Sequence, residues 1–309
     1  MSGEGSAMQD EAARGQYLRH FDPQAYHDTY YASVDQDLAF FLQCYHHAFH
    51  AEPRLARRSP ARRRLLEVGC GPVPVYTACA SAFASSVTMS EFLPQNRCEM
   101  QAWMEGKEEA LDWSVFFNYL ASLSPHRSVK DIESQLRSRF AEVIPCDLTM
   151  DDPLISPAHR ASYDVVMTTL CLEFVASSKD DYYLMVGRLV SLLRPGGVLI
   201  MAGALKNSKY LLGGLTYPSV PLGEEDLRAA LRPHCQEDVT IRTLHRRGLL
   251  QDKPADHEGV FFLLTQRRQE GESEGGNEYR DVNDEMKCGG REMKIEEKNE
   301  DGGNRRRKE

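Results

Sequence analysis

The sequence contains no apolar run of the roughly 18 residues that a membrane-spanning helix needs. Its start, MSGEGSAMQDEAARGQ, lacks the apolar segment of a secretory signal, so we expect a cytoplasmic protein without a membrane partner. Basic residues do not dominate: 37 Lys and Arg stand against 46 Asp and Glu, which argues against a nucleic-acid partner. None of the eight cysteines forms a Cys-x-x-Cys pair, so we expect reduced thiols in a chain of 309 residues.

Aliphatic residues almost disappear near the end of the chain. Residues 270–309 hold 13 acidic and 9 basic residues, with only Val282 and Ile295 as aliphatics, so this segment cannot bury enough apolar area to offset its ordering entropy. The prediction is a flexible N-terminus over residues 1–14, one domain over residues 15–268 and a disordered charged tail over residues 269–309. The RRRK near the end leaves a nuclear signal or an acidic-surface contact open, with a solvated tail favoured.

Within the domain, apolar runs of strand length alternate with amphipathic stretches. An Arg-Pro-Gly-Gly sequence at 194–197 indicates the end of a helix and a tight turn. This alternation predicts an α/β fold with a doubly wound parallel sheet, and a ligand beyond the carboxyl ends of its first strands. The expected strands are 64–68, 86–90, 143–147, 163–168, 198–202 and 259–266, and the expected helices are 76–83, 96–107, 180–193 and 224–231.

A glycine turn, Gly69-Cys70-Gly71, follows the first expected strand. Two glycines there let the backbone approach a ligand closely, although a tight turn without a ligand stays open. The third glycine of the dinucleotide pattern and the Gly-Lys-Ser/Thr of a P-loop are both lacking, which argues against NAD and against a nucleotide triphosphate site. Glu91, about 20 residues on, is placed to accept hydrogen bonds from a ribose, and Asp147 is placed to read an adenine amino group.

These features together resemble a class I S-adenosylmethionine-dependent methyltransferase with a Rossmann-like sheet. The segment YLRHFDPQAYHDTYY, residues 17–31, is similar to the N-terminal helical lid of the family that contains nicotinamide, phenylethanolamine and indolethylamine N-methyltransferases. The similarity covers about residues 17–267, and Asp-Trp-Ser at 112–114 and Leu-Cys-Leu-Glu at 170–173 are specific to this family. Further matches lie at 87–92, 109–114, 143–147, 192–197, 204–206 and 220–223.

The resemblance implies a set of residues that bind S-adenosylmethionine. Tyr26 and Tyr31 would close over the methyl and methionine parts, and Asp147 with Leu148 would frame the adenine. Two purely structural alternatives to donor binding stay open: the tyrosines only pack against the domain, and Asn96 only caps the following helix. Gly69 and Gly71 would pass along the donor backbone, and Glu91 would bind the ribose. Asn96 would contact the donor nearby, and Thr169 would lie near its amino-acid end.

One position departs from the family. The family has a tyrosine three residues after Gly-Pro, whereas here Tyr76 comes one place late and Val75 falls at that position. Either the turn is redrawn around Pro74, so that Tyr76 keeps the donor contact, or the contact is lost.

Methyl transfer from a sulfonium is an in-line displacement, so we expect positioning and water exclusion rather than a metal. An amine must be neutral when it attacks, and an acidic group beside it can hold the ammonium form and take its proton directly or through a water. The resemblance assigns these catalytic roles to Glu173 and Asp256, which also bind the acceptor. It places Asn207, Tyr210 and Ser219 in the acceptor pocket.

The predicted function is therefore N-methylation of a small amine or N-heterocycle by a protein that the resemblance suggests is monomeric. Asn207 replaces a glutamate of phenylethanolamine-type members and Gly203 an aspartate of nicotinamide-type members, so the acceptor stays unnamed. The alternative is a degenerate member that binds the donor or a partner protein without turnover. A macromolecular substrate at an arginine cluster is less favoured than a solvated loop; the cluster comprises Arg54, Arg57, Arg58, Arg62, Arg63 and Arg64.

Overall fold

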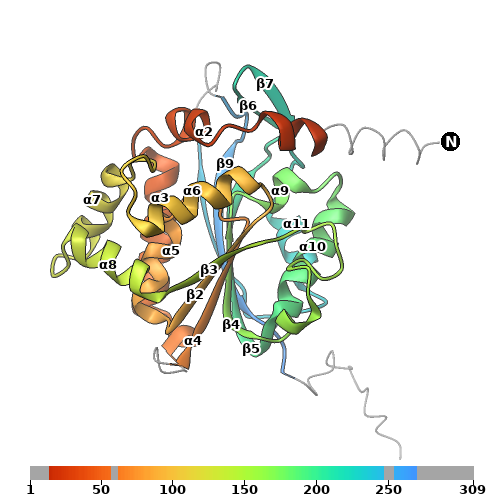
Figure 1. The fold of residues 1–309 in the computed structure, drawn as a ribbon. Helices are drawn as coiled ribbons and strands as arrows, with labels where there is room; N and C mark the ends of the chain where they lie inside the picture. The colour runs from red at the N-terminus through yellow and green to blue at the C-terminus, as the bar shows by residue number, and fades with distance from the viewer. Residues whose placement is uncertain (1–13, 57–61, 247–253, 270–309) are drawn as a thin grey trace, which may run out of the picture. The chain divides into compact units, whose positions relative to one another are not determined.

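A seven-stranded sheet in the order β3-β2-β1-β4-β5-β9-β8 forms the centre of the domain (Figure 1). The computed structural model describes residues 14–56, 62–246 and 254–269. The predicted charged tail and flexible N-terminus lie outside these residues, apart from residues 14 and 269. Among the described residues, no helix is long and apolar enough to cross a membrane.

The first five strands of the sheet run parallel. β4 pairs with both β1 and β5, and β9 is antiparallel to β5 and to β8. The strand order reverses between β1 and β4, which makes their carboxyl ends the switch point of a doubly wound sheet and confirms the predicted fold class. The bounds are β1 Arg64–Val68, β2 Ser86–Glu91, β3 Phe140–Pro145, β4 Tyr163–Thr169, β5 Leu193–Leu205, β8 Thr240–His245 and β9 Gly259–Gln266.

Helices lie on both faces of this sheet (Figure 1), and an apolar layer fills the space on each face. One face is covered by α3 (Gln36–Ala51), α5 (Val75–Ala80), α6 (Pro94–Glu105) and α8 (Val129–Arg139), and α7 (Ser114–Leu123) packs on α3, α5 and α8. The other is covered by α9 (Leu172–Val175), α10 (Lys179–Leu192) and α11 (Glu224–Leu231). Alternate residues of β1 follow this division, since Leu65 belongs to the first layer and Leu66 to the second. The shorter elements are α4 (Pro53–Ala56), η2 (Ser81–Phe83) and η3 (Pro157–His159).

Two local predictions are corrected. The predicted helix does end at the Arg-Pro-Gly-Gly sequence, since α10 ends at Leu192, but the strand does not wait until Val198, because β5 begins at Leu193 and contains this sequence as a bulge. Tyr163 pairs with Leu193 and Val165 with Val198, so three residues of β4 lie opposite six of β5. The third strand is displaced as well: it ends at Pro145, and Asp147 lies in the loop that follows.

The N-terminal segment forms the predicted helical lid. Residues 14–20 are helical, and α2 (Pro23–Tyr30) follows, with Asp22 as its N-cap and Pro23 in its first turn. The Tyr30 hydroxyl donates to the Leu211 carbonyl at 2.8 Å, which ties the segment to a hairpin of β6 (Lys209–Leu212) and β7 (Leu215–Pro218). α2 also packs against α6 (Pro94–Glu105), which follows β2 (Figure 1).

Candidate active site

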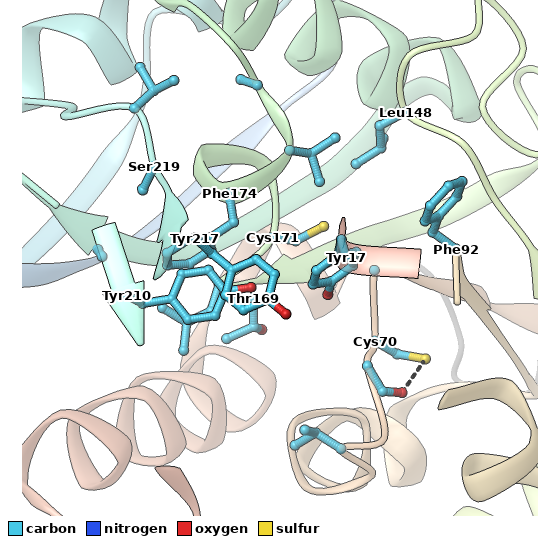
Figure 2. Close-up of a pocket in the computed structure, with 18 of the residues that line it drawn as sticks. Tyr17, Cys70, Phe92, Leu148, Thr169, Cys171, Phe174, Tyr210, Tyr217 and Ser219 are labelled. Carbon is cyan, nitrogen blue, oxygen red and sulfur yellow. Dashed lines mark hydrogen bonds between the residues drawn. The ribbon is translucent and has the colours of Figure 1, made fainter. Parts of the chain in front are cut away.

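A cavity of about 700 Å³ lies at the switch point. Its walls include the residues just after β1, β2, β3 and β4, together with the N-terminal segment and the β6–β7 hairpin. In Figure 2, Tyr210, Tyr217 and Phe174 gather on one side, while Phe92 and Leu148 lie on the other. The cavity therefore has two ends, one walled by aromatic rings and one by the loops after the first strands.

The glycine turn lies against this cavity in a conformation that favours glycine. Gly69 and Gly71 both have positive φ, 67° and 58°. A Cβ atom on Gly69 would lie 2.1 Å from the Cys171 sulfur, so β1 and β4 can end this close together only with glycine here. The Gly71 N–H donates to Glu91 Oε2 at 2.9 Å, which fixes the turn to the end of β2.

Besides the Gly71 N–H, the Glu91 carboxylate accepts two further hydrogen bonds. Its Oε1 accepts from the Leu93 N–H at 2.8 Å and from Asn96 Nδ2 at 3.3 Å. Burial raises the pKa of Glu91, and the hydrogen bonds from Leu93, Gly71 and Asn96 act in the opposite direction. Asn96 does not cap α6, since it lies within the first turn and is fully buried, with its Oδ1 unpaired.

The tyrosine that comes one place late lines the cavity, and Val75 does not. Tyr76 and Tyr31 approach each other with their hydroxyl oxygens 3.3 Å apart, and burial raises the pKa of both well above the usual value. Tyr45 of α3, which the sequence did not suggest, holds Thr169 Oγ1 at 2.7 Å. The turn around Pro74 is thus drawn so that the tyrosine, rather than the valine, reaches the site.

The loop after β3 forms the second end of the cavity. Asp147 accepts from the Thr149 N–H at 3.0 Å, and Leu148 and Phe92 complete the walls there (Figure 2). Arg14 of the N-terminal helix donates to both carboxylate oxygens of Asp147. Partial burial raises the pKa of Asp147, but the hydrogen bonds from Arg14 and Thr149 outweigh this effect, so the pKa is lowered on balance.

The aromatic end contains two of the predicted acceptor residues, Tyr210 and Ser219. Tyr210 stacks on Tyr217 with ring centroids 5.0 Å apart, and Phe174 meets the Tyr210 ring edge-on at 5.0 Å. Tyr17 of the N-terminal segment meets Tyr217 at 5.8 Å. Flat rings on several sides form an apolar slot that suits a small planar or aromatic molecule.

Glu173 lies behind the wall of the cavity rather than in it. Its carboxyl accepts from the Ala204 N–H at 2.8 Å, and its carbonyl accepts from the Val220 N–H at 2.8 Å and from the Ser219 hydroxyl at 3.2 Å. Those three partners line the cavity. Burial raises the pKa of the Glu173 carboxyl to about 7.

Asp256 and Asn207 also do not line the cavity. The carboxylate of Asp256 accepts from the backbone N–H groups of Ser208, at 2.8 Å, and Lys209, at 3.1 Å. It thereby fixes the start of β6, one residue before Tyr210. Asn207 is fully buried, and neither its amide oxygen nor its amide nitrogen has a partner.

The arginine cluster does not form one surface patch in the part of the chain that the structure describes. Arg63 is buried, and its Nη1 donates to the Phe83 carbonyl at 2.7 Å. Arg54 pairs with Glu52 at 2.8 Å, while Arg57 and Arg58 lie outside the described residues. Over residues 14–56, 62–246 and 254–269, no group of three or more His, Cys, Asp or Glu side chains could hold a metal ion.

The sheet order, the glycine turn and its bonded glutamate define a Rossmann-like methyltransferase fold. The chain belongs to the NNMT/PNMT/TEMT family, which it matches over residues 9–268. Members of this family use S-adenosylmethionine, and the chain is an S-adenosylmethionine-dependent N-methyltransferase.

Relatives of known activity align with most of this chain and over most of their own length. Human phenylethanolamine N-methyltransferase is 30% identical over 267 residues, which is 83% of this chain and 92% of the relative. Human nicotinamide N-methyltransferase is 30% identical over 258 residues, or 81% and 94%. Among solved structures, the magnesium protoporphyrin IX methyltransferase of Synechocystis PCC 6803 with bound SAM is 16% identical, covers 84% of this chain and 96% of its own, and gives a TM-score of 0.48.

Proposed function

We propose that the protein transfers a methyl group to the nitrogen of a small amine or N-heterocycle, bound at the aromatic end of the cavity. The observation that carries this proposal is the continuity of one cavity from the Glu91 and glycine-turn end to the slot of Tyr210, Tyr217 and Phe174. The named relatives methylate phenylethanolamine and nicotinamide, which are molecules of the size such a slot accepts.

The donor end fits an adenosyl sulfonium. A carboxylate offers about four acceptor positions, and Glu91 uses three, which leaves one on Oε2 for a ribose hydroxyl. We assign Gly69 and Gly71 to the donor backbone, Asn96 to a donor contact beside Glu91, and Tyr26, Tyr31, Tyr76 and Thr169 to the methionine half. Asp147 and Leu148 would receive the adenine. S-adenosylmethionine, once bound, supplies the methyl group on a positively charged sulfur.

At the acceptor end, the chain's task is to align a neutral nitrogen with the methyl and exclude water. Tyr210 and Ser219 would contact the acceptor. Glu173 would hold the wall formed by Ala204, Ser219 and Val220, and would receive the amine's proton through a water, because its carboxyl does not line the cavity. A pKa of about 7 suits such an exchange at neutral pH. Asp256 would position the Tyr210 hairpin, and Asn207 would support the same loop from behind.

The experiment is calorimetric titration with S-adenosylhomocysteine, followed by a screen of amines and pyridines with labelled donor. We expect binding that weakens strongly in Glu91→Ala, and turnover of at least one small acceptor. Binding without turnover of any acceptor would favour the non-catalytic alternative, and no binding by the folded protein would refute the donor site.

A further inference from the structure

Arg14, in the helix that precedes α2, reaches the end of the cavity where the adenine is proposed to lie. Its Nη1 donates to Asp147 Oδ1 at 3.3 Å and to Thr149 Oγ1 at 3.0 Å, and its Nη2 donates to Asp147 Oδ2. The guanidinium carbon also lies 4.4 Å from the centre of the Phe92 ring. One planar cation thus contacts the ring that follows β2 and the carboxylate that follows β3.

We call Arg14 together with Asp147 and Phe92, both of which it contacts, the clamp. A guanidinium binds a carboxylate in a two-pronged fashion and stacks on an aromatic face, which a lysine ammonium does not do equally well. The Asp147 side chain is 17% exposed and that of Arg14 39% exposed, so solvent screens the pair only in part. The hydrogen bond from Arg14 is the largest influence that lowers the pKa of Asp147, which keeps this carboxyl ionised.

The clamp leaves room for a ligand. Asp147 Oδ1 accepts from Arg14, from the Thr149 N–H and from the Thr149 hydroxyl, whereas Oδ2 accepts from Arg14 alone. One acceptor position therefore remains on Oδ2. An exocyclic amino group of a purine is a donor that this position suits.

We propose that Arg14 is a positioning residue for the methyl donor, which orients Asp147 toward the adenine amino group and fixes Phe92 as a wall of the same subsite. The inference rests on the proposed function, since it takes the adenine to lie between these residues. It assigns a task to the helix before α2 that the tyrosines of the lid do not perform. Closing of the N-terminal segment and selection of adenine become one event, because Arg14 belongs to that segment and Asp147 to the sheet loop.

The test compares two ligands and three proteins by calorimetry. The ligands are S-adenosylhomocysteine and S-inosylhomocysteine, in which a carbonyl oxygen replaces the amino group. The proteins are the wild type, Arg14→Ala and the control Arg19→Ala, which removes the same charge from an exposed position of the same helix outside the cavity. We expect Arg14→Ala to weaken S-adenosylhomocysteine about tenfold and S-inosylhomocysteine less than about threefold, with Arg19→Ala near the wild type.

Three results would overturn the inference. Binding of S-adenosylhomocysteine that does not weaken in Arg14→Ala is the first: unchanged binding would mean that Arg14 takes no part in donor binding, and tighter binding would mean that it occupies the subsite. An equal loss with both ligands would indicate a general structural role. If the wild type bound both ligands equally, Asp147 would not read the amino group at all. Failure of the donor site itself is distinguishable from these, because the wild type would then bind neither ligand, and failure of methyl transfer alone would show as binding of S-adenosylhomocysteine without turnover of any acceptor.

Discussion

The buried carboxyl of Glu173 makes stability depend on pH in a direction that can be worked out. The residue is 2% exposed, and burial raises the pKa of its carboxyl from the usual 4.5 to about 7 in the folded protein. Between those pH values the folded state holds a proton that the unfolded state has lost, so the free energy of unfolding falls as pH rises. This one group costs about 3 kcal/mol at pH 8 compared with pH 4.

Glu173→Gln removes this cost, because a glutamine carbonyl can still accept from the Ala204 N–H and carries no charge. We expect the free energy of unfolding of the variant minus that of the wild type to be about 2 to 3 kcal/mol larger at pH 8 than at pH 5, so that the variant gains stability relative to the wild type as pH rises. Urea unfolding at the two pH values measures this difference directly. Parallel curves for both proteins would refute the assignment of a raised pKa to Glu173.

The same variant should lose activity while it gains stability. In the wild type, kcat is expected to rise with pH through about 7, as the carboxyl becomes able to accept a proton. In Glu173→Gln this rise of kcat with pH should disappear and kcat should fall by about 10²-fold, with the Kd of S-adenosylhomocysteine unchanged. A variant that keeps the wild-type rise would show that another group takes the proton.

Three further predictions follow from single contacts. Glu91→Gln should weaken S-adenosylhomocysteine binding by about 10- to 100-fold, measured by calorimetry, because an amide cannot accept from all three donors and a ribose hydroxyl. Gly203→Ala should destabilise the fold by about 1 to 3 kcal/mol in urea unfolding, since its Cβ would lie 2.6 Å from Glu173 Oε1 and 2.8 Å from Phe261. Asp256→Asn should raise the KM of the acceptor by about tenfold with little change in donor affinity, as the hairpin that carries Tyr210 loosens.

Most of the sheet could be predicted because its strands are short apolar runs bounded by turn residues. β1 and β9 have the predicted bounds, and β2 and β4 differ by one residue at their ends. β8 was missed because its exposed and half-buried residues give no apolar run. β3 was displaced because its six residues are only exposed or half-buried and give no apolar run before Val143, and its pairing with β2 fixes the strand instead.

Some residues of the candidate site could likewise be predicted from local sequence patterns, and others could not. Residues whose role depends on a turn or a strand end, such as Gly69, Gly71 and Glu91, could be placed from spacing, since all three line the cavity and Gly71 donates a hydrogen bond to Glu91. Arg14 and Tyr45 could not be placed, because each acts on a residue more than 120 positions away. Their partners are set by how the N-terminal segment and α3 cross the sheet, which no local pattern in the sequence specifies.

The N-terminal segment contacts each part of the cavity through a different side chain. Arg14 holds Asp147, Tyr17 meets Tyr217 of the acceptor slot, and Tyr31 approaches Tyr76. We expect a displacement of this segment to disturb all three contacts, because the side chains belong to one short stretch of chain. On the proposed assignment of the two ends, we therefore expect donor affinity and acceptor selection to be coupled, so that a substitution at one end of the segment changes the binding of both ligands.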